Sequence, residues 1–149
     1  MTFEIKKTDG KARNGILKLP NGMVETPVFM PVGTQGTVKA MFTEKLEEIG
    51  FKIILANTYH MFLRPGCEVL DGFGGLNNFM KWDKPILTDS GGFQIMSLSK
   101  LTKIHNDGVH FQSHIDGKKF YLTPKLSMEI QNSIGSDIQM VLDQCIEYD

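Results

Sequence analysis

Four short apolar runs most strongly constrain the fold of this chain. They lie at 28–32, 52–56, 85–88 and 138–142, and segments with helix or turn signals separate them. Continuous apolar runs of this length are typical of strands buried on both faces. Strands that alternate with helices form parallel sheets with right-handed crossovers. The sequence therefore predicts an α/β protein built on a parallel sheet.

Three of these runs end on a polar side chain: Asn57, Asp89 and Asp143. Carboxyl ends of parallel strands meet at one edge of the sheet, where α/β proteins place their sites. Asp and Ser also commonly cap turns, but convergence at three strand ends favours a ligand site. An ionised carboxylate there accepts hydrogen bonds from adjacent N–H groups, as on the N1/N2 edge of guanine, an amide or a guanidinium. These residues alone do not name the substrate.

Two other segments have the pattern of antiparallel meanders. Residues 1–27 alternate between apolar and polar and contain two turn pairs, and residues 103–122 form an inserted β segment with the same features. Thr43 is predicted to cap a helix over 44–49. Thr123 and a proline open a helix over 124–134 that places one apolar stripe on one face.

Composition excludes several classes of protein. At 149 residues the chain can bury one core, and 16 Lys and Arg against 17 Asp and Glu give no basic excess that would indicate nucleic-acid binding. With no long apolar run and no leader, a cytoplasmic protein is expected. The two cysteines, Cys67 and Cys145, lie far apart and are expected to be free thiols rather than a disulfide or a zinc site.

Histidines and aromatic residues are weaker signals. A metal site is one interpretation of three histidines in the inserted segment, but a solvated strand face is the favoured one. His60 follows the second apolar run, and the sequence favours a structural role and a role in the site equally. The large aromatics are predicted to be core rather than a base-stacking surface. The histidines are His105, His110 and His114, and the aromatics are Phe62, Phe73, Phe79 and Trp82.

Five motifs, taken together and in order, resemble tRNA-guanine transglycosylases, which exchange the wobble guanine of certain tRNAs on the queuosine pathway. They are PVFMPVGTQGTVKA (27–40), ILANTYHMFLRPG (54–66), PILTDSGGFQIMSL (85–98), SHIDG (113–117) and IGSDIQMVLDQC (134–145). The resemblance implies a (β/α)8 TIM barrel preceded by a small antiparallel sheet. Residues 1–149 would then supply the N-terminal part of one catalytic domain: a meander over 1–27, and the first four βα units over 28–149 with a β insertion near 103–122.

The resemblance also implies roles for individual residues. Asp89 would contact the exchanged base and handle its proton, Asp143 would recognise the N1 and 2-amino edge of the purine, and Asn57 would position Asp89. Ser90, Phe93 and Gln94 would complete the base pocket. The cysteine at position 145 is similar to that of the bacterial enzymes of the family, which accept the aminomethyl deazaguanine preQ1. The implied mechanism is base flipping followed by a covalent tRNA intermediate.

The resemblance further implies that the nucleophilic aspartate, the structural zinc site and most of the tRNA-binding surface lie in the second half of the family's enzymes. The chain is therefore expected to hold no metal or cofactor, to be inactive alone, and to act on tRNA and guanine or preQ1 only within a complete enzyme. A homodimer or a complementing half is the expected partner. Two alternatives stay open: a non-catalytic half-barrel that assembles with a second half or full-length subunit, and a small α/β enzyme using Asp89 and Asp143 as acid and base.

Overall fold

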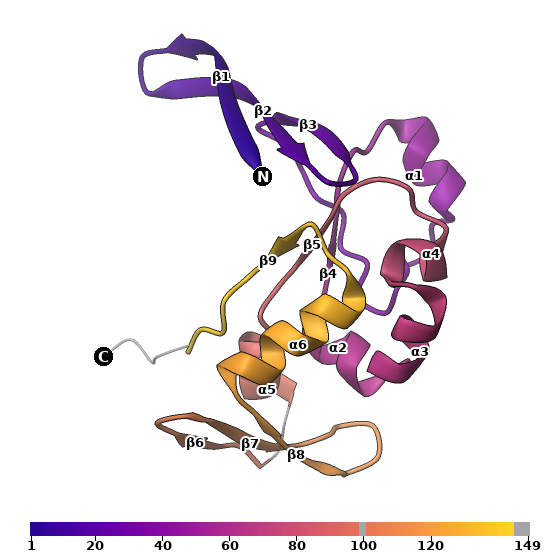
Figure 1. Cartoon of the computed structure of the whole chain (residues 1–149), viewed down its shortest axis with the longest axis vertical. Helices are drawn as coiled ribbons and strands as arrows, with labels where there is room; N and C mark the ends of the chain where they lie inside the picture. The colour runs from indigo at the N-terminus through magenta and orange to yellow at the C-terminus, as the bar shows by residue number, and fades with distance from the viewer. Residues whose placement is uncertain (99–100, 145–149) are drawn as a thin grey trace.

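The structure, a computed structural model, describes residues 1–98 and 101–144 and contains three three-stranded sheets (Figure 1). The central sheet is parallel, in the order β4-β5-β9, and comprises β4 (Ile54–Ala56), β5 (Ile86–Thr88) and β9 (Ile138–Gln139). The other two sheets are antiparallel meanders. The first comprises β1 (Thr2–Asp9), β2 (Ala12–Leu19) and β3 (Gly22–Thr26), and the third β6 (Lys103–His105), β7 (Gly108–Gln112) and β8 (Lys119–Leu122).

Six helices surround the central sheet or follow its strands within the described residues. They are α1 (Thr43–Ile49), α2 (Thr58–Leu63), α3 (Cys67–Phe73), α4 (Leu76–Met80), α5 (Gly92–Leu98) and α6 (Pro124–Ile134). The first sheet projects from one end of the molecule, and the third sheet lies at the opposite end (Figure 1). The structure thus confirms a mixed α/β fold with a parallel sheet and two β-meanders.

The first apolar run is not the strand that the sequence predicted. Of residues 28–32, only Val32 forms a bridge, parallel to Leu55 of β4. Pro31 interrupts the run, and proline has no N–H to donate to a ladder. Its carbonyl still accepts from the Leu55 N–H at 2.9 Å, so the segment lies beside β4 without forming a regular strand. The last strand is also shorter than predicted, ending at Gln139.

The core forms between the central sheet and the helices. Ile54 and Ile86 of the sheet are fully buried, and α6 packs Ile130 and Ile134 against them as its apolar stripe predicted. Thr123 caps α6 by accepting the Leu126 N–H, which confirms the predicted start. The same cluster also includes Phe111 and Leu122, so it ties the third sheet to the body.

The aromatic predictions are confirmed except for one residue. Trp82 is buried, and Phe62 and Phe79 pack against the core. Phe73 is 54% exposed, although its ring packs edge-on against Phe79 with 5.2 Å between centroids. It is the last residue of α3, where the helix ends against solvent, and the prediction that it belongs to the core was wrong.

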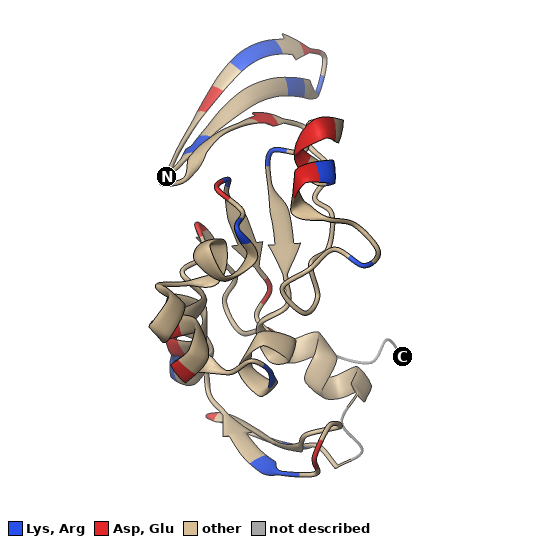
Figure 2. Ribbon diagram, turned by 90° about the vertical axis from the view of Figure 1, so that its right-hand side faces the viewer, with Lys and Arg blue, Asp and Glu red and all other residues tan. Residues whose placement is uncertain are grey.

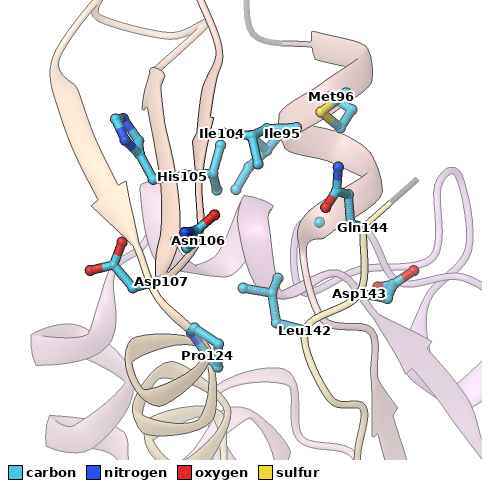
Figure 3. Close-up of a pocket in the computed structure, with 13 residues that line it drawn as sticks. Ile95, Met96, Ile104, His105, Asn106, Asp107, Pro124, Leu142, Asp143 and Gln144 are labelled. Carbon is cyan, nitrogen blue, oxygen red and sulfur yellow. The ribbon is translucent and has the colours of Figure 1, made fainter. Parts of the chain in front are cut away.

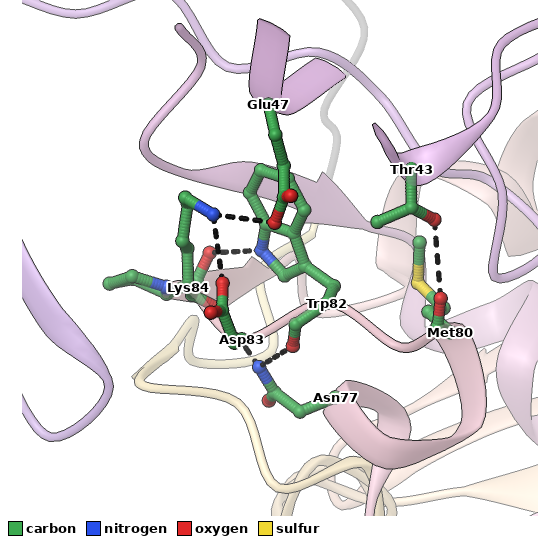
Figure 4. Close-up of polar contacts among 8 residues, drawn as sticks. Thr43, Glu47, Asn77, Met80, Trp82, Asp83 and Lys84 are labelled. Carbon is green, nitrogen blue, oxygen red and sulfur yellow. Dashed lines mark hydrogen bonds and ion pairs between the residues drawn. The ribbon is translucent and has the colours of Figure 1, made fainter. Parts of the chain in front are cut away.

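The start of α1 also differs from the prediction. Phe42 precedes the helix without a side-chain cap, and Thr43 is already its first residue. The Thr43 hydroxyl donates instead to the Met80 carbonyl at 3.2 Å (Figure 4). The threonine therefore ties α1 to α4 rather than satisfying the helix N-terminus.

A cluster of charged and aromatic side chains holds α1 near segment 82–84, which leads into β5 (Figure 4). The Lys84 ammonium contacts Glu47 of α1 at 2.6 Å and Asp83 at 2.8 Å, and it lies 5.0 Å from the Trp82 ring centroid. Burial opposes the charge of Lys84, but hydrogen bonds and charges of the two carboxylates outweigh burial and raise its pKa. Hydrogen bonding to Lys84, helped by its charge, lowers the pKa of Asp83.

The first sheet is fastened to the body through Asp137, which precedes β9. Its carboxylate accepts the backbone N–H of Asn21 at 2.8 Å and the Asn21 side-chain amide at 3.1 Å. It also accepts the N–H of Ile86, the first residue of β5, at 3.0 Å. This one carboxylate therefore joins the turn between β2 and β3 to the beginning of two central strands.

In Figure 2, charged residues lie on the first sheet, on α1 and α3, and on the third sheet. Helix α5 carries none. Among the residues that the structure describes, none of the helices is long and apolar enough to span a membrane.

Candidate functional site

Register brings Asn57 and Asp89 to the same end of the sheet. Ala56 of β4 pairs with Thr88 of β5, so the residues that follow them lie side by side. The Asp89 carboxylate accepts the Asn57 amide at 2.5 Å and the Thr58 backbone N–H at 2.9 Å. Asn57 precedes α2 without capping it, because its side chain turns to Asp89 instead.

Gln94 of α5 supplies a third donor to Asp89. Its Nε2 lies 2.9 Å from Asp89 Oδ2, the same oxygen that the Asn57 amide contacts. The Gln94 Oε1 atom is buried and has no hydrogen-bond partner among the described residues. A buried acceptor of this kind can take a donor from a ligand.

Ser90 connects this loop to the segment after β9. Its buried hydroxyl donates to Asp143 Oδ1 at 2.5 Å and accepts the Gly92 N–H at 3.2 Å. The structure therefore gathers Asp89 and Asp143 about one short loop, the first directly and the second through Ser90. A pair of carboxylates held this way presents several acceptor lone pairs at one end of the sheet.

Two glycines make the loop possible. Gly91 has φ 83°, a left-handed conformation that glycine adopts without strain. A Cβ on Gly92 would lie 2.6 Å from the Asp143 carbonyl oxygen, closer than any real contact. Gly92 therefore lets the main chain of Asp143 approach α5.

A cavity of about 190 Å³ lies beside this cluster, between α5, the turn joining β6 and β7, and segment 142–144 (Figure 3). Asp143 lines it but Asp89 does not. In Figure 3, Leu142 points toward the meander and the Asp143 carboxylate points away from it. The two carboxylates are thus linked through Ser90, and only Asp143 lines this cavity.

The remaining predicted site residues have different surroundings. Phe93, predicted as a wall of the base pocket, is 63% exposed on α5. Cys145 lies outside the described residues. Cys67 is a free, partly buried thiol whose pKa is raised by burial.

His114 is solvent-exposed as predicted, but it does not lie on a strand face. It lies in the turn after β7, and its Nδ1 is 2.8 Å from the Tyr59 hydroxyl while the two rings stack at 5.5 Å. His60 lies edge-on to both rings, and burial, followed by the charge of His114, lowers its pKa against the opposing effect of Asp89. His105 and His110 are exposed as predicted. The described residues contain no His, Cys, Asp or Glu group able to hold a metal.

Sequence reasoning missed three residues that organise the site. Thr58 donates its backbone N–H to Asp89, and its hydroxyl contacts the Asp89 carbonyl. Ser127 and Gln131 of α6 are buried although both are polar. The signal for the latter pair was their four-residue spacing, one position after the apolar stripe of the helix.

Comparison with known proteins assigns the chain to a family. The family model described as queuine tRNA-ribosyltransferase matches residues 8–149. The chain belongs to the queuine tRNA-ribosyltransferase family. The similarity inferred from the five motifs is thereby confirmed.

Individual family members match almost the whole chain. It is 57% identical over 148 residues to the queuine tRNA-ribosyltransferase of Thiobacillus denitrificans, and 59% identical over 148 residues to that of Caldanaerobacter subterraneus subsp. tengcongensis. The Thermotoga neapolitana family member is 59% identical over 145 residues. These alignments cover 99%, 98% and 97% of this chain but 40%, 40% and 39% of the respective relatives. The chain therefore spans about two fifths of the length of its curated relatives.

Proposed function

We propose that this chain supplies the base-binding part of a tRNA-guanine transglycosylase, which exchanges the wobble guanine of tRNA for preQ1. The observation that carries the proposal is the joining of two strand-end carboxylates, Asp89 and Asp143, by the 2.5 Å bond from Ser90. The family match supports the reaction class.

Asp143 is suited to recognise a purine. Ser90 occupies its Oδ1, and the remaining lone pairs of the carboxylate can accept the N1–H and 2-amino donors of guanine. The Ser90 bond fixes the carboxylate before the base arrives, which reduces the entropy lost on binding.

Asp89 is suited to handle the proton of the base. Two of its three donors are side-chain amides, from Asn57 and Gln94, and these can rotate away when a ligand offers its own N–H. Asp89 can then exchange a proton with the leaving or entering base, while the C1′–N9 bond of the flipped nucleotide breaks. The nucleophile that attacks C1′ and the structural zinc site are assigned to the second part of the complete enzyme.

The three parallel strands and the flanking Val32 segment support a further part of the proposal, that this chain builds the first half of a (β/α)8 barrel. The test compares the chain alone with a hybrid protein, in which it replaces the matching segment of the Thermotoga neapolitana relative. With tRNA and labelled guanine, the hybrid should incorporate label and the chain alone should not. Robust exchange by the chain alone, or none by the hybrid, would contradict the proposal.

Among the described residues β9 pairs on one side only, with β5. This open edge favours a second candidate, a non-catalytic half-barrel that joins a separate second half or a full-length subunit. Mixing the chain with the remaining part of the relative distinguishes the two. Exchange that appears on mixing and requires Asp89 would establish assembly between separate chains, including a dimer with a full-length subunit. Exchange only by the covalent hybrid would exclude it.

A further inference from the structure

We propose that Gln131 on α6 is a positioning residue for base recognition, acting with Ser127 one turn earlier. The inference rests on the proposed function, because it concerns how Asp143 and Ser90 are held for the purine. Neither residue touches the carboxylate of Asp143. Both act through the main chain of the segments that carry the site.

Gln131 holds the segment that leads to Asp143. Its side chain is fully buried, its Nε2 donates to the Met140 carbonyl at 2.9 Å, and its Oε1 accepts the Met140 N–H at 3.0 Å. A side-chain amide that both donates and accepts at one residue reproduces the pairing of a neighbouring strand. β9 ends at Gln139, and Met140 also donates to the Thr88 carbonyl at 3.2 Å. Gln131 therefore extends the order of β9 toward the site.

Ser127 holds the other segment. Its hydroxyl donates to the Ser90 carbonyl at 2.9 Å, and the Gln131 amide lies 3.3 Å from that hydroxyl oxygen. Since Ser90 itself donates to Asp143, the contacts close a ring that runs from α6 to both segments and back. Displacing either side of the ring would move the Asp143 carboxylate relative to Asp89.

If position 131 served only to pack the core, an apolar side chain would be expected there. Gln131 lies next to Ile130 and is fully buried, where an apolar side chain would pack without any need for partners. The buried amide instead has several partners, including the Thr88 hydroxyl, which donates to its Oε1 at 2.8 Å. A satisfied buried network of this kind fixes one arrangement of the groups around it.

The experiment uses the active hybrid protein and two variants, Gln131→Met and Ser127→Ala. Methionine keeps the length of the side chain but removes both bonds to Met140. The matched control is Gln139→Ala, because the Gln139 amide joins the same strand and helix through Asn132 at 3.1 Å on the exposed side. For each protein, kcat/KM is measured with guanine and with hypoxanthine, which lacks the 2-amino donor, together with KM for tRNA.

Misplacement of Asp143 should lower the preference for guanine over hypoxanthine about tenfold in Gln131→Met, with a smaller loss in Ser127→Ala. KM for tRNA should stay within about twofold of the parent, and the control should keep its preference. An unchanged preference in both variants, even with reduced stability, would overturn the inference while leaving the proposed function intact. If Gln131→Met fails to fold, Ser127→Ala decides. A parent hybrid without exchange would overturn the proposed function and this inference with it.

Discussion

The two ends of the central sheet use the same residue type differently. Counting donors within residues 1–98 and 101–144, the carboxylates of Asp137, before β9, and Asp89, after β5, each accept three hydrogen bonds. At Asp137 two of the donors are backbone N–H groups, from Asn21 and Ile86. At Asp89 two of the donors are side-chain amides, from Asn57 and Gln94.

This difference in donors bears on whether the contacts of each carboxylate can be replaced by those of a ligand. A backbone N–H is fixed by the fold around it, so the two backbone contacts of Asp137 can break only if β5 or the first sheet moves. A side-chain amide turns about its own torsions, so the two amide contacts of Asp89 can be exchanged for those of a ligand without unfolding. The share of side-chain donors, rather than the number of hydrogen bonds, is thus what differs between the two carboxylates, and it agrees with the proposed role of Asp89 in binding a ligand.

The largest expected effect comes from Asp89→Asn in the hybrid protein. Removing the carboxylate should lower guanine exchange by about 10²–10⁴-fold, because the amide cannot take up a proton from the base. Exchange is measured per folded molecule, with the folded fraction followed by circular dichroism. A variant that keeps more than a tenth of the parent rate would show that the strand-end carboxylate does no proton transfer.

Gly92→Ala should have the next largest effect. The added Cβ would meet the Asp143 carbonyl at 2.6 Å, so segment 142–144 must shift. We expect exchange to fall about 10- to 100-fold and the free energy of unfolding to fall by about 1–3 kcal/mol. Gly72→Ala is the control, because a Cβ in that part of α3 meets nothing within 4 Å. The control should leave exchange unchanged and add up to about 1 kcal/mol of stability.

Asp137→Ala tests the fastening end of the sheet. The change leaves the Asn21 and Ile86 N–H groups without their acceptor, and we expect about 1–3 kcal/mol of destabilisation in urea unfolding of the chain. In the hybrid protein, exchange per folded molecule should stay within about threefold of the parent, since no site residue moves. A loss of exchange comparable to that of Asp89→Asn would show that Asp137 is not merely a structural carboxylate.

The smallest effect is the pH dependence contributed by His60. Burial lowers its pKa below the ordinary 6.5, so the unfolded chain binds its proton first as the pH falls. The stability from neutral His60 is complete above pH 6.5 and is lost below it, toward the lower folded pKa. His60→Gln should therefore flatten the decline in unfolding free energy between about pH 7 and pH 5. Equal curves for the parent and His60→Gln would exclude the effect.

Much of the architecture could be predicted because it depends on local patterns. Turn pairs located both meanders, and the apolar spacing of α6 with Thr123 at its cap located that helix. The strand ends could be predicted to converge because parallel register is regular, and Ala56 does pair with Thr88. These features follow from periodicities of two and 3.6 residues.

Other features depended on contacts between distant segments. Nothing local to Thr43 indicates that its hydroxyl would reach Met80, 37 residues away, and so leave the N-terminus of α1 without a side-chain cap. The stacking of His114 on Tyr59 joins residues 55 apart. The hydrogen bonds of the Gln131 amide to Met140 likewise depend on β9 lying beside α6. Tertiary packing decided each of these cases.

The Asn21–Asp137 fastening has a consequence for synthesis, since its partners are 116 residues apart. At roughly 5–20 residues per second, the ribosome makes Asp137 about 6–23 s after Asn21. During that interval the Asn21 donors in the turn between β2 and β3 lack their acceptor, and a chaperone has access to the first sheet.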